Sequence, residues 1–133
     1  MSRIDPVSPA DAVRARVPAA LAAYAETRAT VLEGGIVDRE LKALCFRYLA
    51  EDDHVVVHMA DPDVFGDRER AALAWAHAVA WDADTADDAL WKRLHEHFSE
   101  PELVELGYAI AFQLGQLHWE RTLAVRPPRP AAP

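Results

Sequence analysis

The sequence has a single cysteine, Cys45, among its 133 residues, so no disulfide can form within the chain. It has no run of basic residues, and its net charge at pH 7 is −8. An acidic surface repels phosphate backbones, which argues against nucleic acid as a partner. No apolar run is long enough to span a bilayer, and the first residues lack the apolar core of a signal peptide. These absences predict a cytoplasmic protein with no nucleic-acid and no membrane partner.

The sequence also lacks internal repeats, a glycine-rich phosphate loop and any alternation of strands with helices. It contains instead a series of apolar positions with helical spacing, in a chain whose length suits one core. We therefore predict an all-α fold of about six helices, in a single domain over residues 1–124. An extended arm over residues 1–7 and a disordered, proline-rich tail over residues 125–133 complete the expected chain.

Capping residues and helix breakers mark the expected helices in the first half of the chain. Ser8 begins an alanine-rich helical stretch, which Pro18 divides and Gly34 with Gly35 ends. The next helix begins at Asp38 and breaks at residues 51–53, where an aspartate caps a short helix. Its apolar stripe has the spacing i, i+3, i+4, i+7, i+8 and consists of Leu41, Leu44, Cys45, Tyr48 and Leu49.

Three further helices are expected in the second half of the chain. Asp67 and Thr85 are each expected to cap one of them. Ser99 and Glu102 form a capping box that opens a long helix reaching about Leu123.

The last helix is apolar on most of its sides between Leu106 and Trp119. A helix of this kind is buried on most sides, either within its own domain or in a subunit interface. A domain of this size has limited capacity to surround such a helix, so we expect a homo-oligomer.

Proton-handling side chains gather in the middle of the chain. Glu51, His54 and His58 have the spacing i, i+3, i+7, so an unbroken helix would place all three on one face. Imidazole titrates near neutral pH and a neighbouring carboxylate orients it, which suits acid–base chemistry on a small-molecule ligand or substrate. The same three residues could bind a divalent metal ion, or they could be a solvated helix start with surface histidines. The sequence leaves these three interpretations open.

The chain resembles the carboxymuconolactone decarboxylase family, which includes the alkylhydroperoxidase D-like (AhpD-like) proteins. The resemblance covers nearly the whole chain and implies an AhpD-like all-α helical bundle that assembles as a dimer, trimer or hexamer. The segments that carry it are SRIDPV, RELKAL, RERAALAWAHAVAW and TADDALWKRLHEHFSEPELVELGYAIAFQLGQLHW.

The peroxidase branch of that family uses a Cys-x-x-Cys-x-x-x-His motif. When His58 is placed on the final histidine, Glu51 and His54 stand where the two cysteines belong. A thiolate attacks peroxide and a second thiol resolves the product, so this degenerate motif argues against a two-cysteine alkylhydroperoxidase.

The resemblance therefore implies a decarboxylase-like or lyase-like enzyme that works without thiols on a small lactone or carboxylated substrate. The residues carried over as catalytic are His58, His54, Glu51 and Glu40. No cofactor and no metal is part of this expectation. The alternative is a non-catalytic family member that binds a small molecule or serves as an oligomeric scaffold; a metal-binding variant and residual peroxidase-like activity are less favoured.

Overall fold

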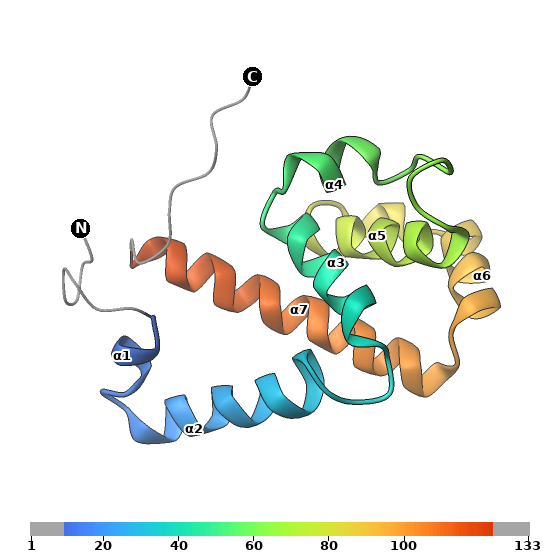
Figure 1. The fold of residues 1–133 in the computed structure, drawn as a ribbon. Helices are drawn as coiled ribbons and strands as arrows, with labels where there is room; N and C mark the ends of the chain where they lie inside the picture. Colours follow the sequence, from blue (N-terminus) through green and yellow to red (C-terminus); the bar gives the residue numbers. More distant parts are fainter. Residues whose placement is uncertain (1–9, 124–133) are drawn as a thin grey trace.

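The computed structural model describes residues 10–123, and over this range the chain consists of helices without β-strands. Seven α-helices, one π-helical turn and one 3-10 turn follow one another in this range (Figure 1). The all-α class is thereby confirmed, and the count exceeds about six because α1 and α2 are separate helices. The arm expected over residues 1–7, the Ser8 cap and the tail expected over residues 125–133 lie outside the described residues.

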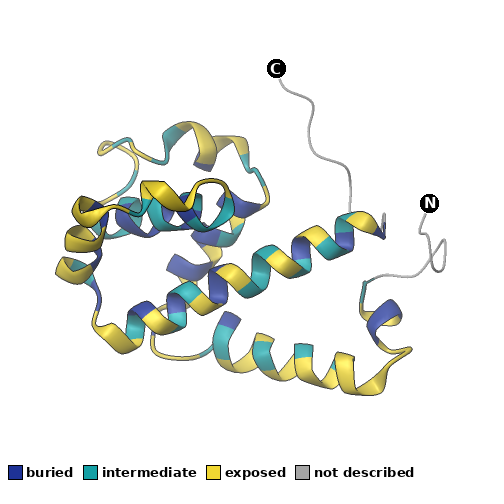
Figure 2. Ribbon diagram, turned by 180° about the vertical axis from the view of Figure 1, so that it is seen from behind, coloured by how far each residue is buried: buried dark blue, intermediate teal, exposed yellow. Residues whose placement is uncertain are grey.

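The N-terminal segment comprises α1 (Ala10–Arg14), α2 (Pro18–Thr27) and the π-helical turn η1 (Arg28–Leu32). Pro18 stands at the start of α2, which confirms the predicted division of this stretch. Gly35 follows the segment with a φ of 90°, a conformation that glycine adopts without strain. No residue of α2 is buried, and Figure 2 shows this helix as mostly exposed.

The remaining helices form the main body of the described chain (Figure 1). Within it, α3 packs against both α5 and α7, and α5 packs against α6 and α7. The elements are α3 (Arg39–Leu49), α4 (Asp53–His58), α5 (Asp67–Ala80), the 3-10 turn η2 (Ala83–Thr85), α6 (Asp88–His97) and α7 (Glu100–Thr122).

Two of the predicted helix caps are confirmed by their hydrogen bonds. The Asp38 carboxylate accepts from the backbone amide of Leu41 at 3.1 Å. Ser99 and Glu102 form the expected capping box: the Ser99 hydroxyl accepts from the Glu102 amide at 3.3 Å, and the Glu102 carboxylate accepts from the Ser99 amide at 2.9 Å. Local side-chain chemistry thus sets where α3 and α7 begin.

The predicted caps of α5 and α6 are wrong. Gly66 is the N-cap residue of α5, and Asp67 is already its first helical residue. The N-cap of α6 is Asp87, whose carboxylate accepts from the Leu90 amide at 2.9 Å, whereas Thr85 belongs to η2. In each case two residues suited to an N-cap lie close together in the sequence. The residue that caps the helix is the one whose backbone is extended, and the sequence alone does not show which one that is.

The hydrophobic core lies among α3, α5, α6 and α7. The predicted apolar stripe of α3 is buried along its whole length, at Leu41, Leu44, Cys45, Tyr48 and Leu49. Within one chain, α7 is buried on one side only, so of the two expected forms of burial the structure does not show the one within its own domain, and burial in a subunit interface stays a prediction. Leu106 and Ile110 are fully buried, but Val104 and Tyr108 keep 73% and 56% of their surface exposed.

A buried ion pair holds the loop after η1 against the main body. Lys42 is fully buried, and its ammonium donates to the Val31 carbonyl at 2.7 Å and lies 2.9 Å from the Glu105 carboxylate. Glu105 also accepts from the backbone amides of Ile36 at 3.0 Å and Val37 at 2.7 Å. Burial acts to raise the pKa of Glu105, but these hydrogen bonds outweigh it and hold that pKa below its ordinary value. The Lys42–Glu105 pair thereby fixes α2 and η1 relative to α3 and α7.

Within residues 10–123 there is no helix with both the length and the apolar character needed to cross a membrane.

Candidate functional site

A sharp break separates α3 from α4, and it falls inside the predicted trio. Glu51 has a φ of 63°, in the left-handed region that is uncommon for residues other than glycine. Asp52 then caps α4, because its carboxylate accepts from the His54 amide at 3.1 Å. Glu51 is therefore not on the helix that carries His54 and His58, and the single i, i+3, i+7 face does not form.

The two predicted histidines remain together on α4. Their ring centroids are 4.7 Å apart, and Nδ1 of His58 lies 2.8 Å from the backbone carbonyl oxygen of His54. Since a carbonyl can only accept, Nδ1 of His58 carries a proton, and in the neutral ring Nε2 keeps its lone pair. His58 is half-buried and His54 is exposed. The bond thus selects the Nδ1-protonated tautomer of the neutral His58 ring and orients that ring.

Glu51 meets α7 instead of the histidine pair. Its Oε2 atom lies 3.7 Å from Nη2 of Arg121, and the two side chains are 26% and 20% exposed. One turn earlier on α3, the buried hydroxyl of Tyr48 lies 2.6 Å from Nδ1 of His77 on α5. Burial raises the pKa of Tyr48 above its ordinary value, and the negative charge of Glu51 adds to this effect. We call Tyr48, Glu51, His77 and Arg121 the junction cluster.

Glu40 and Cys45 lie outside the junction cluster. Glu40 is exposed in the first turn of α3, eleven positions before Glu51, which is about 16 Å along a helix axis. The thiol of Cys45 is fully buried, and burial, followed by the charge of Asp38, raises its pKa to about 12. A thiol in this state stays protonated at neutral pH and is a poor nucleophile.

The described residues offer no preformed metal site. Between residues 10 and 123, no group of three or more His, Cys, Asp or Glu side chains is arranged to hold a metal ion. The metal-binding interpretation of Glu51, His54 and His58 therefore lacks geometric support, because the backbone break separates the carboxylate from the imidazoles.

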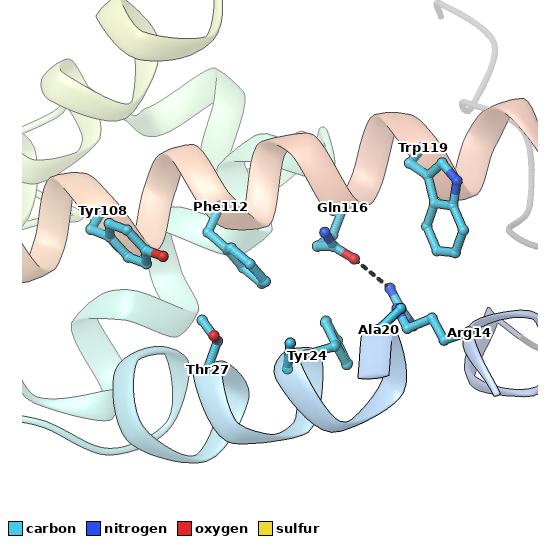
Figure 3. Close-up of a pocket in the computed structure, with 9 residues that line it drawn as sticks. Arg14, Ala20, Tyr24, Thr27, Tyr108, Phe112, Gln116 and Trp119 are labelled. Carbon is cyan, nitrogen blue, oxygen red and sulfur yellow. Dashed lines mark hydrogen bonds between the residues drawn. The ribbon is translucent and has the colours of Figure 1, made fainter. Parts of the chain in front are cut away.

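A second site, which the sequence patterns did not predict, is a cleft of about 510 Å³ between α2 and α7. This volume lies within the usual range for small-molecule sites, about 300–1,000 Å³. Figure 3 shows side chains of α7 pointing toward α2, and those of α2 pointing back. We call this site the aromatic cleft, and its lining residues are Arg14, Ala20, Ala23, Tyr24, Thr27, Tyr108, Phe112, Gln116 and Trp119.

The aromatic rings of the cleft lie nearly parallel to one another. The ring centroids of Tyr24 and Phe112 are 6.2 Å apart with 21° between their planes, and those of Phe112 and Tyr108 are 6.3 Å apart with 13°. The guanidinium carbon of Arg14 lies 3.7 Å from the centre of the Tyr24 ring and 5.0 Å from that of Trp119. These distances allow cation–π contact at one end of the cleft.

Arg14 is buried at that end, and three side chains accept its hydrogen bonds. Nη1 donates to Asp11 at 2.9 Å, and Nη2 donates to both Gln116 and Glu120 at 2.8 Å (Figure 3 marks the Gln116 bond). Among the described side chains at this end, Arg14 is thus paired with two carboxylates, Asp11 and Glu120. The Arg14 bond also orients the Gln116 amide, because only the amide oxygen can accept it.

The sequence did carry one signal for the aromatic cleft. Tyr108, Phe112, Gln116 and Trp119 follow the spacing i, i+4, i+8, i+11, which places them on one face of α7. The spacing does not show what lies opposite that face. The position of α2 depends on the buried ion pair and the loop after η1, which are tertiary features.

Comparison of the chain with family models, with curated proteins and with solved structures finds no match. The functional conclusions below therefore rest on the geometry of the described side chains and on the resemblance noted from the sequence.

Proposed function

We propose that this protein catalyses thiol-independent acid–base chemistry on a small carboxylated or lactone substrate, at the junction of α3 and α4. The observation that carries the proposal is the junction cluster. It comprises a hydroxyl–imidazole pair at 2.6 Å and a carboxylate–guanidinium pair at 3.7 Å, and burial, with the charge of Glu51 adding to it, raises the pKa of Tyr48.

The junction cluster supplies the groups that a decarboxylation of this kind requires. Loss of carbon dioxide leaves an enolate-like charge that needs a proton and a nearby hydrogen-bond donor. Tyr48 and His77 share a hydrogen bond and can pass a proton to that position, while a substrate carboxylate would replace Glu51 as the partner of Arg121. His58 adds a base of fixed tautomer on the neighbouring helix.

The left-handed backbone of Glu51 belongs to the end of α3. The Asp52 amide donates to the Arg47 carbonyl and the Glu51 amide to the Tyr48 carbonyl, both at 3.0 Å, which is a Schellman motif with Glu51 at its left-handed position. This helix end leaves the Glu51 carboxylate beside Arg121 on α7, and in this proposal the carboxylate orients the guanidinium that receives the substrate.

The resemblance to the carboxymuconolactone decarboxylase family supports the same reaction class. The chain keeps His58 and lacks the cysteine pair, and its remaining thiol is buried with a raised pKa. Family membership, the cytoplasmic location and the absence of a two-cysteine peroxidase activity are parts of this proposal.

The proposal includes a homo-oligomer. Val104 and Tyr108 on α7 are exposed apolar side chains, and α2 has no buried residue, so a second copy could cover both helices. Light scattering on the full chain is expected to give a multiple of the 14.8 kDa protomer mass, and a monomer at all concentrations would contradict this part.

The activity is tested by measuring carbon dioxide release from a panel of small carboxylated lactones. Tyr48→Phe and His58→Asn are each expected to lower kcat by about 100-fold, which is the low end of the rate enhancement that one acid–base group provides. His95→Asn, an exposed histidine on α6, is the matched control and should keep full activity. A wild-type protein without turnover, or variants that all match it, would leave the non-catalytic scaffold as the better account.

A further inference from the structure

We infer that the aromatic cleft binds a neutral, planar aromatic molecule of one or two rings that carries a hydrogen-bond acceptor. This site is separate from the proposed reaction site. Trp119 lines the cleft, whereas Arg121 of the junction cluster lies two residues on, which is about 200° around α7. The two sites therefore use opposite faces of one helix.

The shape of the cleft favours a flat ligand. Three rings line it in a nearly parallel series. The planes of Tyr24 and Phe112 are 21° apart, and those of Phe112 and Tyr108 are 13° apart. Aromatic groups gain most from offset stacking or edge contact with such rings. Beside Tyr24 and Thr27, the α2 wall contributes the small side chains of Ala20 and Ala23, so room remains for a ring between the helices. A volume of about 510 Å³ suits one or two fused rings.

The charges in the cleft favour a neutral ligand over an anion or a cation. The Arg14 guanidinium already donates to two carboxylates, Asp11 and Glu120, so it cannot neutralise a ligand anion without breaking those bonds. A cation is disfavoured for a different reason. Arg14 itself occupies the cation–π positions over Tyr24 and Trp119, so a ligand cation would have to displace it to reach either ring.

The orientation of Gln116 specifies a hydrogen-bond acceptor on the ligand. Its Oε1 atom accepts from Arg14 at 2.8 Å, which leaves the amide nitrogen to act as donor toward the cleft. A carbonyl or phenolic oxygen on the ligand would accept this bond. Phenols, quinones and related oxygenated arenes have the required combination of a flat apolar body and one acceptor.

The experiment uses 2-naphthol as the probe and isothermal titration on the full chain. We expect one molecule bound per protomer, with at least about tenfold tighter binding than either 2-naphthoate or naphthalen-2-ylmethylammonium, because each ion adds an unbalanced charge. Gln116→Leu should weaken 2-naphthol binding about fivefold, as expected for the loss of one hydrogen bond. Quenching of tryptophan fluorescence gives a second readout, since Trp119 lines the cleft.

A pair of variants on α2 distinguishes filling of the cleft from a general effect on the helix. Ala23→Leu places a larger side chain in the cleft, while Ala22→Leu makes the same change at an exposed position that does not line it. Ala23→Leu should abolish 2-naphthol binding, and Ala22→Leu should leave it unchanged.

Four results would overturn the inference. The first three are no heat of binding with 2-naphthol, equal affinity for the anionic probe, and equal 2-naphthol binding by the two leucine variants. The fourth is that Ala23→Leu changes the assembly of protomers but not the affinity for 2-naphthol, which would make the cleft a subunit contact. None of these results depends on turnover at the junction cluster, so the inference and the proposed reaction can fail independently.

Discussion

Removing the charge of Glu105 tests whether the buried ion pair determines the position of α2. In Glu105→Gln, the Lys42 ammonium stays fully buried but loses its carboxylate partner. The amide that replaces the carboxylate has one oxygen, where Glu105 uses its two to accept from Ile36, Val37 and Lys42. Breaking a buried ion pair from one side costs about 3–5 kcal/mol. Because 15% of the Glu105 side chain is exposed, we expect a loss of unfolding free energy at the lower end of this range, about 3 kcal/mol.

Urea denaturation followed by circular dichroism measures this loss, and a pH series gives its electrostatic signature. The pKa of Glu105 is lowered in the folded chain, so its contribution is fully present above the unfolded value near 4.5. The contribution is lost as the pH falls through the lower, folded pKa. The difference in stability between wild type and Glu105→Gln should therefore be constant at neutral pH and shrink in acid.

Glu96→Gln is the matched control, since Glu96 is exposed on α6 and the substitution is the same. It should change the free energy of unfolding by no more than about 0.5 kcal/mol. The reasoning is refuted if Glu105→Gln is as stable as this control at pH 7, or if the loss persists unchanged at a pH where Glu105 is protonated in both states.

Four further predictions concern single positions. Cys45 should resist alkylation by iodoacetamide in the native protein and react only in denaturant, because its thiol is fully buried; rapid native labelling, detected by mass spectrometry, would contradict the core assignment. Gly35→Ala should destabilise the protein by at least about 2 kcal/mol in urea, owing to the φ of 90° and a Cβ only 1.8 Å from the Glu105 carboxylate. Gly115→Ala, where a Cβ meets no atom within 4 Å, should instead stabilise it by about 0.5–1 kcal/mol. Glu51→Gly should raise the melting temperature while lowering turnover, since glycine relieves the left-handed strain and removes the carboxylate; a lower melting temperature would show that the Glu51 side chain contributes more than the strain costs.

The predictions that succeeded depend on interactions within a few residues of one another. The stripe of α3 is buried because its apolar side chains recur at helical spacing, and the Ser99 box forms because Glu102 is three residues away. The cap of α6 shows where this reasoning ends. Thr85 and Asp87 both have side chains that can cap a helix. Asp87 is the N-cap because its backbone is the one that is extended directly before α6.

The predicted reaction site shows a different limit. The spacing of Glu51, His54 and His58 implies one face only if the helix is unbroken, and a single left-handed residue removes that condition. The groups that meet instead, such as Tyr48 with His77, are 29 residues apart in the chain. No short pattern relates them, because the packing of α3 against α5 brings them together.

Local sequence was sufficient for the all-α class, most helix ends and the buried face of α3, since backbone hydrogen bonds and side-chain periodicity act over about four residues. The packed chain alone decided which side chains share a site. Arg14 binds Gln116 and Glu120 across 102 and 106 residues, and Glu51 reaches Arg121 on the last helix. Contacts of this range depend on where every intervening helix packs. For that reason both candidate sites, the junction cluster and the aromatic cleft, belong to the tertiary structure.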